Sequence, residues 1–276
     1  MQQTNQAAQS APDYSAIKAK QQQVWRSGDY SQVGSTLQIT GEELCEAMDL
    51  HSGQSVLDVA AGNGNATIAA ARRFCDVTST DYVESLLNES KNRAQANHLS
   101  VNYQQADAEA LPFADEAFDN VMSTFGVMFT PNQQQSASEL MRVCKKGGKI
   151  GMANWTPDGF IGQLFKVIGK YNPPPQGVNS PANWGTQDFL QQQFGEQASN
   201  IQVNEKNYQF RYKSPQHWME VFKTYYGPTL KTFEMLDAPQ AEALEADIYA
   251  LLDEFNTATD GTLVVPSKYV EVVIEK

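Results

Sequence analysis

The sequence contains few residues of the kinds that hold metal ions, form disulfides or bind nucleic acid. Its three cysteines and three histidines form no CxxC pair and no cluster with metal-ligand spacing, so we expect reduced, buried cysteines and no metal site. Positive charge is also scarce, because 20 Lys and Arg residues stand against 32 Asp and Glu residues, which gives a net charge of −12. A surface of that sign repels phosphate backbones and anionic membranes, and we therefore expect no nucleic-acid partner.

Long apolar runs are missing as well. No stretch approaches the length of about 18 apolar residues that indicates a membrane-spanning helix, so membrane insertion is not expected. Residues 1–14 have neither the basic nor the apolar region of a signal peptide, and a cytoplasmic protein is expected. Because these residues are polar and low in complexity, we also predict that they form a disordered tail.

Short apolar runs alternate with amphipathic stretches in the central part of the chain, which is the pattern of β-α-β units around a parallel sheet. The expected strands cover residues 55–59, 76–80, 101–105, 118–124 and 149–154. The expected helices between them cover residues 66–74, 83–97 and 133–144. We therefore predict a doubly wound α/β domain whose sheet is mostly parallel.

Helical segments are expected on both sides of this region. Residues 15–50 are predicted to contain two helices, over 16–25 and 41–48, and this segment either folds over a bound ligand as a lid or only packs against the domain. Residues 201–212 are predicted to be one long strand or a strand pair. Two further helices, over 214–236 and 239–256, are inserted before a last strand, 269–274, which we interpret as an edge strand that closes the sheet.

A glycine loop, Gly62-Asn63-Gly64, follows the first expected strand. A nicotinamide-binding loop needs a third glycine, which brings the following helix close to a pyrophosphate, but Thr67 holds that position. Asp58 precedes the glycines, where its carboxylate repels a pyrophosphate and suits a ligand that carries an amino group and a sulfonium. An NAD-linked oxidoreductase is therefore the less favoured alternative.

Two more carboxylates follow the next expected strands. Asp81, at the tip of the second strand, can accept hydrogen bonds from both hydroxyls of a ribose. Asp107 and Ala108 follow the third strand, where the carboxylate can accept from an adenine amino group. Because the carboxyl ends of parallel strands meet at one edge of a sheet, we expect Asp58, Asp81 and Asp107 to surround one adenosyl ligand.

These motifs resemble a known family. Val56 to Gly64 resemble motif I of the class I S-adenosylmethionine-dependent methyltransferases, and Asp107 to Phe113 and Leu140 to Gly148 resemble their type 11 branch, the ubiquinone/menaquinone-biosynthesis type. The resemblance is specific for residues 55–154, and it departs from the usual pattern at Ala61 and Asn63. It implies a seven-stranded Rossmann-like methyltransferase fold over residues 51–276, with substrate-side loops and a helical insertion in 156–257.

The resemblance also implies which residues bind S-adenosyl-L-methionine, whose product is S-adenosyl-L-homocysteine. They are Asp58, Ala60, Gly62, Asn63, Gly64, Asp81, Tyr82, Asp107, Ala108, Thr124 and Phe125. Within this set Asp58 contacts the amino end directly or through water, Asp81 the ribose and Asp107 the adenine edge. Thr124 and Phe125 border the reacting methyl group.

Methyl transfer from a sulfonium needs a donor and an acceptor held in line, and it needs no protein nucleophile. Tyr30 and His217 are the candidate catalytic residues, since each lies in an aromatic segment outside the cofactor motifs. We expect a small-molecule methyl acceptor, whose identity the sequence leaves open. A homodimer and a non-catalytic S-adenosylmethionine-binding protein are kept as alternatives.

Overall fold

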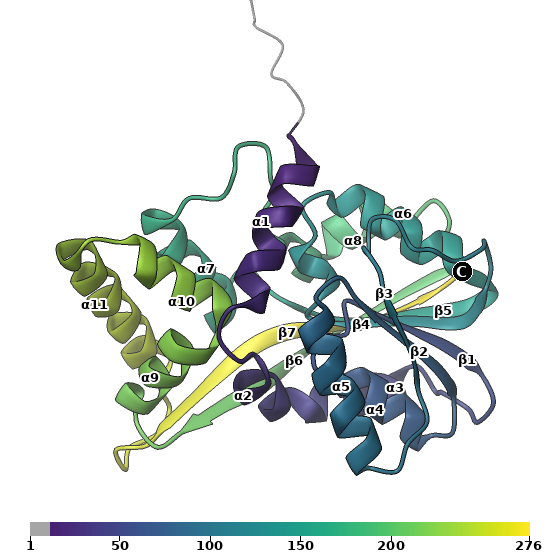
Figure 1. Ribbon diagram of the computed structural model, residues 1–276, viewed down its shortest axis with the longest axis horizontal. Coiled ribbons are helices and arrows are strands. Elements are labelled where there is room, and N and C mark those ends of the chain that lie inside the picture. The colour runs from purple at the N-terminus through teal and green to yellow at the C-terminus, as the bar shows by residue number, and fades with distance from the viewer. Residues whose placement is uncertain (1–11) are drawn as a thin grey trace, which may run out of the picture.

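The computed structural model describes residues 12–276, and a seven-stranded sheet runs through its centre (Figure 1). The first eleven residues of the predicted tail lie outside the described range. The strands are β1 Ser55–Val59, β2 Asp76–Asp81, β3 Asn102–Gln105, β4 Phe118–Thr124, β5 Cys144–Trp155, β6 Asn200–Tyr212 and β7 Leu263–Glu275. They lie in the order β3-β2-β1-β4-β5-β7-β6.

The first five strands are parallel, as the alternating pattern predicts, whereas β7 is antiparallel to both of its neighbours. The expectation that residues 269–274 form an edge strand was wrong, because β7 lies between β5 and β6 and residues 269–274 are all buried. The edge is β6, one continuous strand that pairs with β7 from Asn200 to Tyr212.

Helices cover both faces of the sheet. They are α1 Tyr14–Arg26, α2 Ser31–Gly34, α3 Gln38–Ala47, α4 Asn65–Arg72, α5 Glu84–Ala96, α6 Gln133–Val143, α7 Phe160–Tyr171, α8 Gln187–Phe194, α9 Pro215–Tyr225, α10 Gly227–Met235 and α11 Ala238–Phe255. Successive side chains of a strand point to opposite faces, so Val56 of β1 packs into the core under α3 and α4, whereas Leu57 and Val59 pack into the larger core on the other face. Among residues 12–276, no helix has the length and apolar character needed to cross a bilayer.

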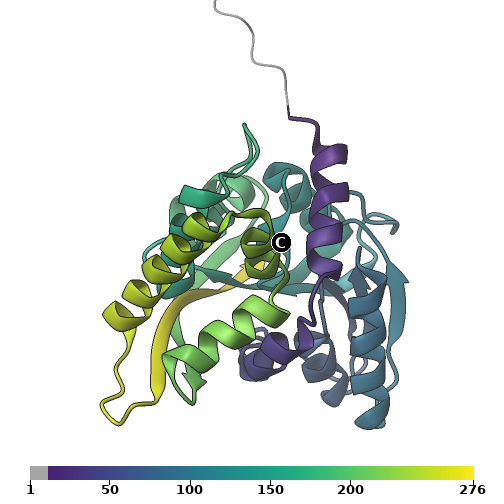
Figure 2. The ribbon, with the colours of Figure 1, turned by 60° about the vertical axis from the view of Figure 1, so that its left-hand side comes forward.

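The N-terminal helices differ in how they attach to the domain. The expected second helix, 41–48, begins earlier, because α2, a 3₁₀ turn at Ser35–Leu37 and α3 form one nearly continuous helical run. By contrast, α1 contains no buried residue. Figures 1 and 2 both show α1 standing between α10 on one side and α5 on the other, above the edge of the sheet where the parallel strands end.

The insertion between β6 and β7 contains three helices rather than the two expected. The single helix predicted over 214–236 breaks at Tyr226, whose backbone is extended, and Gly227 and Pro228 begin α10. Proline fixes its own backbone and lacks an amide hydrogen, so it is tolerated in a first helical turn and not inside a continuous helix. The break turns the chain so that α9 and α10 contact each other.

Candidate active site

A cavity that is partly open to solvent lies at the carboxyl ends of the parallel strands. Each of these five strands contributes a residue to its wall at or just after its end: Ala60, Asp81, Ala106, Thr124 and Trp155. Ligands of open α/β sheets bind at this edge, where the chain leaves each strand for the following helix. The cavity is therefore the candidate active site.

Most of the residues that the sequence motifs single out line this cavity. They are Ala60, Gly62, Asn63, Asp81, Tyr82, Asp107, Ala108, Thr124 and Phe125. Asp58 and Gly64 do not. The Asp58 carboxylate lies behind the glycine loop, where it accepts a hydrogen bond of 2.6 Å from the Thr67 hydroxyl of α4. Gly64 packs against α5, because a Cβ there would come within 2.0 Å of Ser90 Oγ.

Asp81 connects the end of β2 to the glycine loop. One carboxylate oxygen accepts a hydrogen bond from the Gly62 amide at 2.9 Å, and the other accepts from the Val83 amide at 2.8 Å. Burial raises the pKa of Asp81 to about 6, although these amide hydrogen bonds oppose the shift. A carboxylate has about four acceptor positions, so Asp81 can still accept two hydrogen bonds from a ligand in the cavity.

Asp58 is fully buried, and only one of its two carboxylate oxygens accepts a hydrogen bond from the described part of the chain. Within residues 12–276, its Oδ1 atom has no hydrogen-bond partner, whereas Oδ2 accepts from Thr67. Burial, together with a smaller effect of the neighbouring Asp81 carboxylate, raises the pKa of Asp58 to about 7, although hydrogen bonds from Thr67 oppose the shift. The expected cluster of three carboxylates on one wall is thus reduced to Asp81 and Asp107, with Asp58 directly behind the loop.

Two strand ends meet closely at the floor of the cavity. Ala60 and Phe125 both have positive φ angles, 52° and 55°, which side-chain-bearing residues rarely adopt. Gly126 follows Phe125, and a Cβ on Gly126 would lie 2.1 Å from the Ala60 carbonyl oxygen. Strained backbone of this kind persists where the surrounding structure holds it, and here it brings the ends of β1 and β4 into contact.

Arg93 of α5 holds the glycine loop from behind, a role that sequence reasoning missed. One guanidinium nitrogen donates to the Asn63 carbonyl at 2.6 Å and to Asn65 Oδ1 at 2.9 Å. The other donates to Gln38 Oε1 at 2.5 Å. The side chain thereby fixes the loop relative to both α4 and the start of α3.

One face of α1 covers the cavity. Lys18 forms ion pairs with Asp107 at 2.5 Å and Glu109 at 2.9 Å, and the Gln22 amide donates to the Tyr82 carbonyl at 2.5 Å. Trp25 continues the same face, since positions 18, 22 and 25 follow helical spacing. Lys18 and Gln22 were also missed, although their spacing in the sequence could have indicated a polar helix face that meets a ligand site rather than a core.

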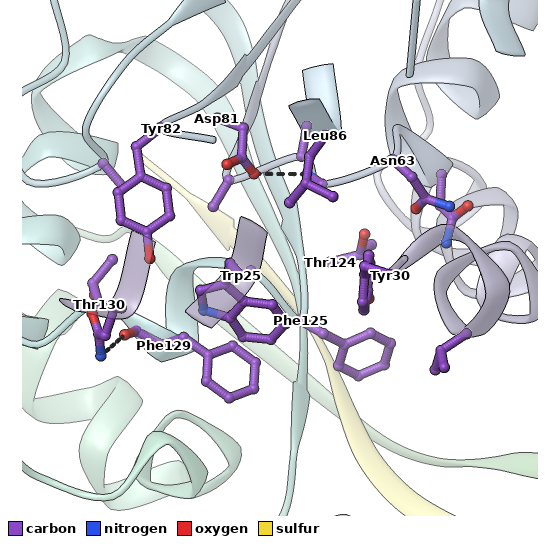
Figure 3. Close-up of a pocket in the computed structure, with 18 of the residues that line it drawn as sticks. Trp25, Tyr30, Asn63, Asp81, Tyr82, Leu86, Thr124, Phe125, Phe129 and Thr130 are labelled. Atoms are coloured by element: carbon purple, nitrogen blue, oxygen red, sulfur yellow. Dashed lines mark hydrogen bonds between the residues drawn. The ribbon is translucent and has the colours of Figure 1, made fainter. Parts of the chain in front are cut away.

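The far end of the cavity is aromatic. Figure 3 shows Asp81 and Tyr82 along one side and the rings of Trp25, Phe125 and Phe129 along the other. The Trp25 ring meets the rings of Tyr30, Phe129 and Tyr226 edge to face, at centroid distances of 5.8, 5.0 and 5.7 Å. Phe125 is stacked on Trp155 at 3.9 Å.

The structure separates the two candidate catalytic residues. Tyr30 lines the cavity, whereas His217 does not. Phe222 of the same helix does face the cavity, and His217 lies five residues earlier, about 140° away around the helix. The His217 ring instead accepts from the Lys213 amide at 3.3 Å. His217 is therefore not brought to the cavity with Tyr30, because the way α9 packs turns this side chain away.

Comparisons with known proteins agree with this geometry. Residues 57–152 match the type 11 family model described as "Methyltransferase domain". An uncharacterized protein of Mycobacterium tuberculosis is 39% identical over 238 residues, which cover 84% of this chain and 87% of that protein. Demethylmenaquinone methyltransferase of Deinococcus radiodurans is 30% identical over 144 residues, 51% of this chain and 60% of that protein.

The chain belongs to the type 11 branch of the class I S-adenosylmethionine-dependent methyltransferases. It is an enzyme, and its cofactor is S-adenosyl-L-methionine, so the NAD-linked and non-catalytic alternatives are set aside. The methyltransferase also shares its fold with the YcgJ protein of Bacillus subtilis, with a TM-score of 0.60, 17% identity and coverage of 88% of this chain and 99% of that chain. The MccD protein gives a TM-score of 0.55 at 16% identity, with 86% and 96% covered.

Proposed function

We propose that this methyltransferase transfers the methyl group to a small-molecule acceptor by in-line displacement inside the cavity. The observation that carries the proposal is the division of one cavity into a carboxylate-lined end, with Asp81 and Asp107, and an aromatic end, with Trp25 and Phe125. A cavity roofed by α1 suits a small acceptor better than a segment of a polymer.

The residues present fit the cofactor. Asp81 has acceptor positions free for the two ribose hydroxyls, and Asp107, Ala108 and Tyr82 suit the adenine. The unpartnered Oδ1 of Asp58 lies behind the loop formed by Ala60 to Gly64, where a bridging water would connect it to the amino end of the methionine portion. Asp58 therefore acts through the loop rather than by direct contact.

When bound, S-adenosylmethionine would supply a methyl group on a positively charged sulfur, with neutral S-adenosylhomocysteine as the leaving group. The protein's contribution is to hold the acceptor in line and exclude water, which is worth up to about 7–11 kcal/mol in favourable cases. Thr124 and Phe125 border the junction between the two ends of the cavity, where transfer takes place in this proposal. Trp25 and the rest of the inner face of α1 shield it from solvent.

Calorimetric titration with S-adenosylhomocysteine tests the placement of the cofactor. Asp81→Ala removes two charge-assisted hydrogen bonds worth about 1.5–3 kcal/mol each, so the affinity should fall at least about a hundredfold. Asp76→Ala, at the exposed start of the same strand, is the matched control and should bind normally. Unchanged affinity in a folded Asp81→Ala variant would refute the placement of the ribose.

The acceptor is tested separately with the wild-type enzyme. Release of S-adenosylhomocysteine is measured with a metabolite library and, in parallel, with peptide and nucleic-acid pools. Turnover with small molecules alone supports the proposal. Turnover with a polymer and with no small molecule would contradict it, whatever the affinity for the cofactor.

A further inference from the structure

The outer edge of the sheet, at β6, is long and unpaired. β6 has 13 residues and pairs with β7 in one continuous register (Figure 1). Alternate residues of such an edge strand turn their backbone N–H and C=O groups away from the neighbouring strand. Within residues 12–276, no hydrogen bond joins these outward groups of β6 to another part of the chain.

β6 also lacks the features that protect an edge strand. A proline, a bulge or a short strand prevents another chain from adding to a sheet. The opposite edge is protected in this way, because β3 has only 4 residues. β6 contains no proline and no bulge. The charge of its Lys206 is neutralised by Glu271 at 2.8 Å and Glu43 at 3.2 Å, so this lysine does not keep another strand away.

Two side chains of opposite charge lie on one face of β6. Glu205 and Arg211 are an even number of positions apart, so the alternation of side chains along a strand places both on the same face. The Glu205 side chain is 69% exposed, and its contact with Lys268 is long, at 3.8 Å. Arg211 is exposed and forms no ion pair within the part of the chain that the structure describes. Both charges are therefore available to a partner at this edge.

We propose that β6 pairs antiparallel with β6 of a second copy of this chain, around a two-fold axis at Tyr208. This register places Glu205 directly opposite Arg211 of the partner subunit, and the symmetry forms this ion pair twice. A register centred on Glu205 or on Lys206 would instead place like charges opposite each other. The proposal goes beyond the proposed function, since it concerns contact between copies and not methyl transfer.

An exposed apolar side chain supports the same axis. Ile39 of α3 is 55% exposed and lines a groove that also contains Tyr208 and Gln209 of β6. The Tyr208 hydroxyl donates to the Thr36 carbonyl at 2.8 Å, so the start of this helical segment is attached to the strand at the axis. Pairing around Tyr208 brings the grooves of the two copies together and covers both Ile39 side chains. Their burial opposes the repulsion between two chains that each carry a net charge of −12.

Sedimentation equilibrium of the full-length chain tests the proposal, in about 0.15 M salt, where exposed charges farther apart than about 8 Å are largely screened. We expect the wild type to dimerise as its concentration rises. Glu205→Arg and Arg211→Glu should each weaken dimerisation at least about tenfold, because each creates two pairs of like charges. The double variant with both substitutions restores opposite charges and should dimerise within about threefold of the wild type.

Overall repulsion alone predicts a different pattern. Glu205→Arg lowers the net negative charge and Arg211→Glu raises it, so repulsion would strengthen one dimer and weaken the other. Glu242→Arg, at an exposed position of α11, changes the net charge as Glu205→Arg does and is the matched control. Amide hydrogen exchange in β6 should also slow as the wild type dimerises, because the outward N–H groups gain partners.

Four results would overturn the proposal. They are a wild type that stays monomeric at every concentration, a dimer that only one or neither single variant weakens, a double variant that does not recover, and unchanged hydrogen exchange in β6 of the dimer. Circular dichroism of each variant separates loss of dimerisation from loss of folding. These measurements use neither cofactor nor acceptor, so their outcome is independent of the proposed function.

Discussion

The ammonium group of Lys18 lies 2.5 Å from the carboxylate of Asp107, although the two residues are 89 positions apart in the sequence. This ion pair connects α1 to the loop after β3, across the cofactor end of the cavity. Since α1 has no buried residue, contacts of this kind hold it in place. The pair is partly exposed, with 24% and 32% of the two side chains accessible, so it stabilises the fold weakly.

Lys18→Ala should therefore affect the cofactor more than the fold. We expect the free energy of unfolding to change by less than about 1 kcal/mol and S-adenosylhomocysteine to dissociate several-fold faster, because α1 opens more readily. Stopped-flow displacement measures the dissociation rate. Lys20→Ala, an exposed position on the same helix, should match the wild type. Equal rates in all three proteins would show that α1 does not control access.

Cofactor affinity should depend on the ionisation of Asp81. Its pKa of about 6 means that the carboxylate, which accepts from the ribose hydroxyls, predominates only above that pH. Affinity for S-adenosylhomocysteine should thus increase between pH 5 and pH 7 and then level off, with proton release on binding. Asp81→Asn should bind more weakly, and the increase around pH 6 should be lost or much reduced. Calorimetry in two buffers of different ionisation enthalpy measures the proton release, and a flat wild-type profile would contradict the prediction.

Asp58 should make the ligand-free protein less stable as pH rises. Its pKa is about 7 in the folded protein and near the ordinary 3.8 in the unfolded chain, so the folded state binds the proton more tightly. The stabilisation from the protonated form is present below about pH 4 and is lost as pH rises to about 7. Asp58→Asn should flatten the decrease in Tm between pH 5 and pH 8, with Asp76→Asn as control. A decrease of the same size in Asp58→Asn would disprove this origin.

The contact between the ends of β1 and β4 should tolerate no added methyl group. Gly126→Ala places a Cβ 2.1 Å from the Ala60 carbonyl oxygen, so we expect a loss of about 1–3 kcal/mol and weaker cofactor binding. Gly169→Ala on α7 meets no atom within 4 Å and should be neutral or stabilising by up to about 1 kcal/mol. Chemical denaturation of both variants and the wild type measures the changes in the free energy of unfolding. A stable Gly126→Ala that binds normally would mean that the two strand ends can separate.

Local pattern was enough to predict the parallel part of the sheet, because β1 to β5 alternate with helices and their carboxyl ends must meet at one edge. Strand order beyond β5 was not predictable in this way. Residues 269–274 alternate as an edge strand does, but pairing with β5 and β6, distant in sequence, buries both of their sides. Long-range pairing, and not the pattern of the segment itself, sets that position.

The candidate site was predictable to a similar extent. Asp81 and Asp107 lie in motifs directly after their strands, so the sequence locates them at the cavity. Asp58 lies inside β1, one residue before the strand ends, and not after it as Asp107 does. Side chains alternate along β1, and the side chain of Asp58 points behind the glycine loop, so the motif alone does not show that it misses the cavity. Whether Tyr226 and His217 reach the cavity depends on how α9 packs against the sheet. No short-range signal in the sequence fixes the rotation of a helix about its axis.

The helices that cover the aromatic end leave the sheet after β6 and return to it in β7, the strand directly beside β6. An exchange of this segment between homologues would therefore join two neighbouring strands at both cut points and leave β1 to β4 in place. Chimaeras made at these positions would exchange Phe222 and Tyr226, which this segment supplies to the aromatic end, and keep the recipient's residues at the carboxylate-lined end. The architecture thus offers a modular route for redirecting this catalyst toward new compounds.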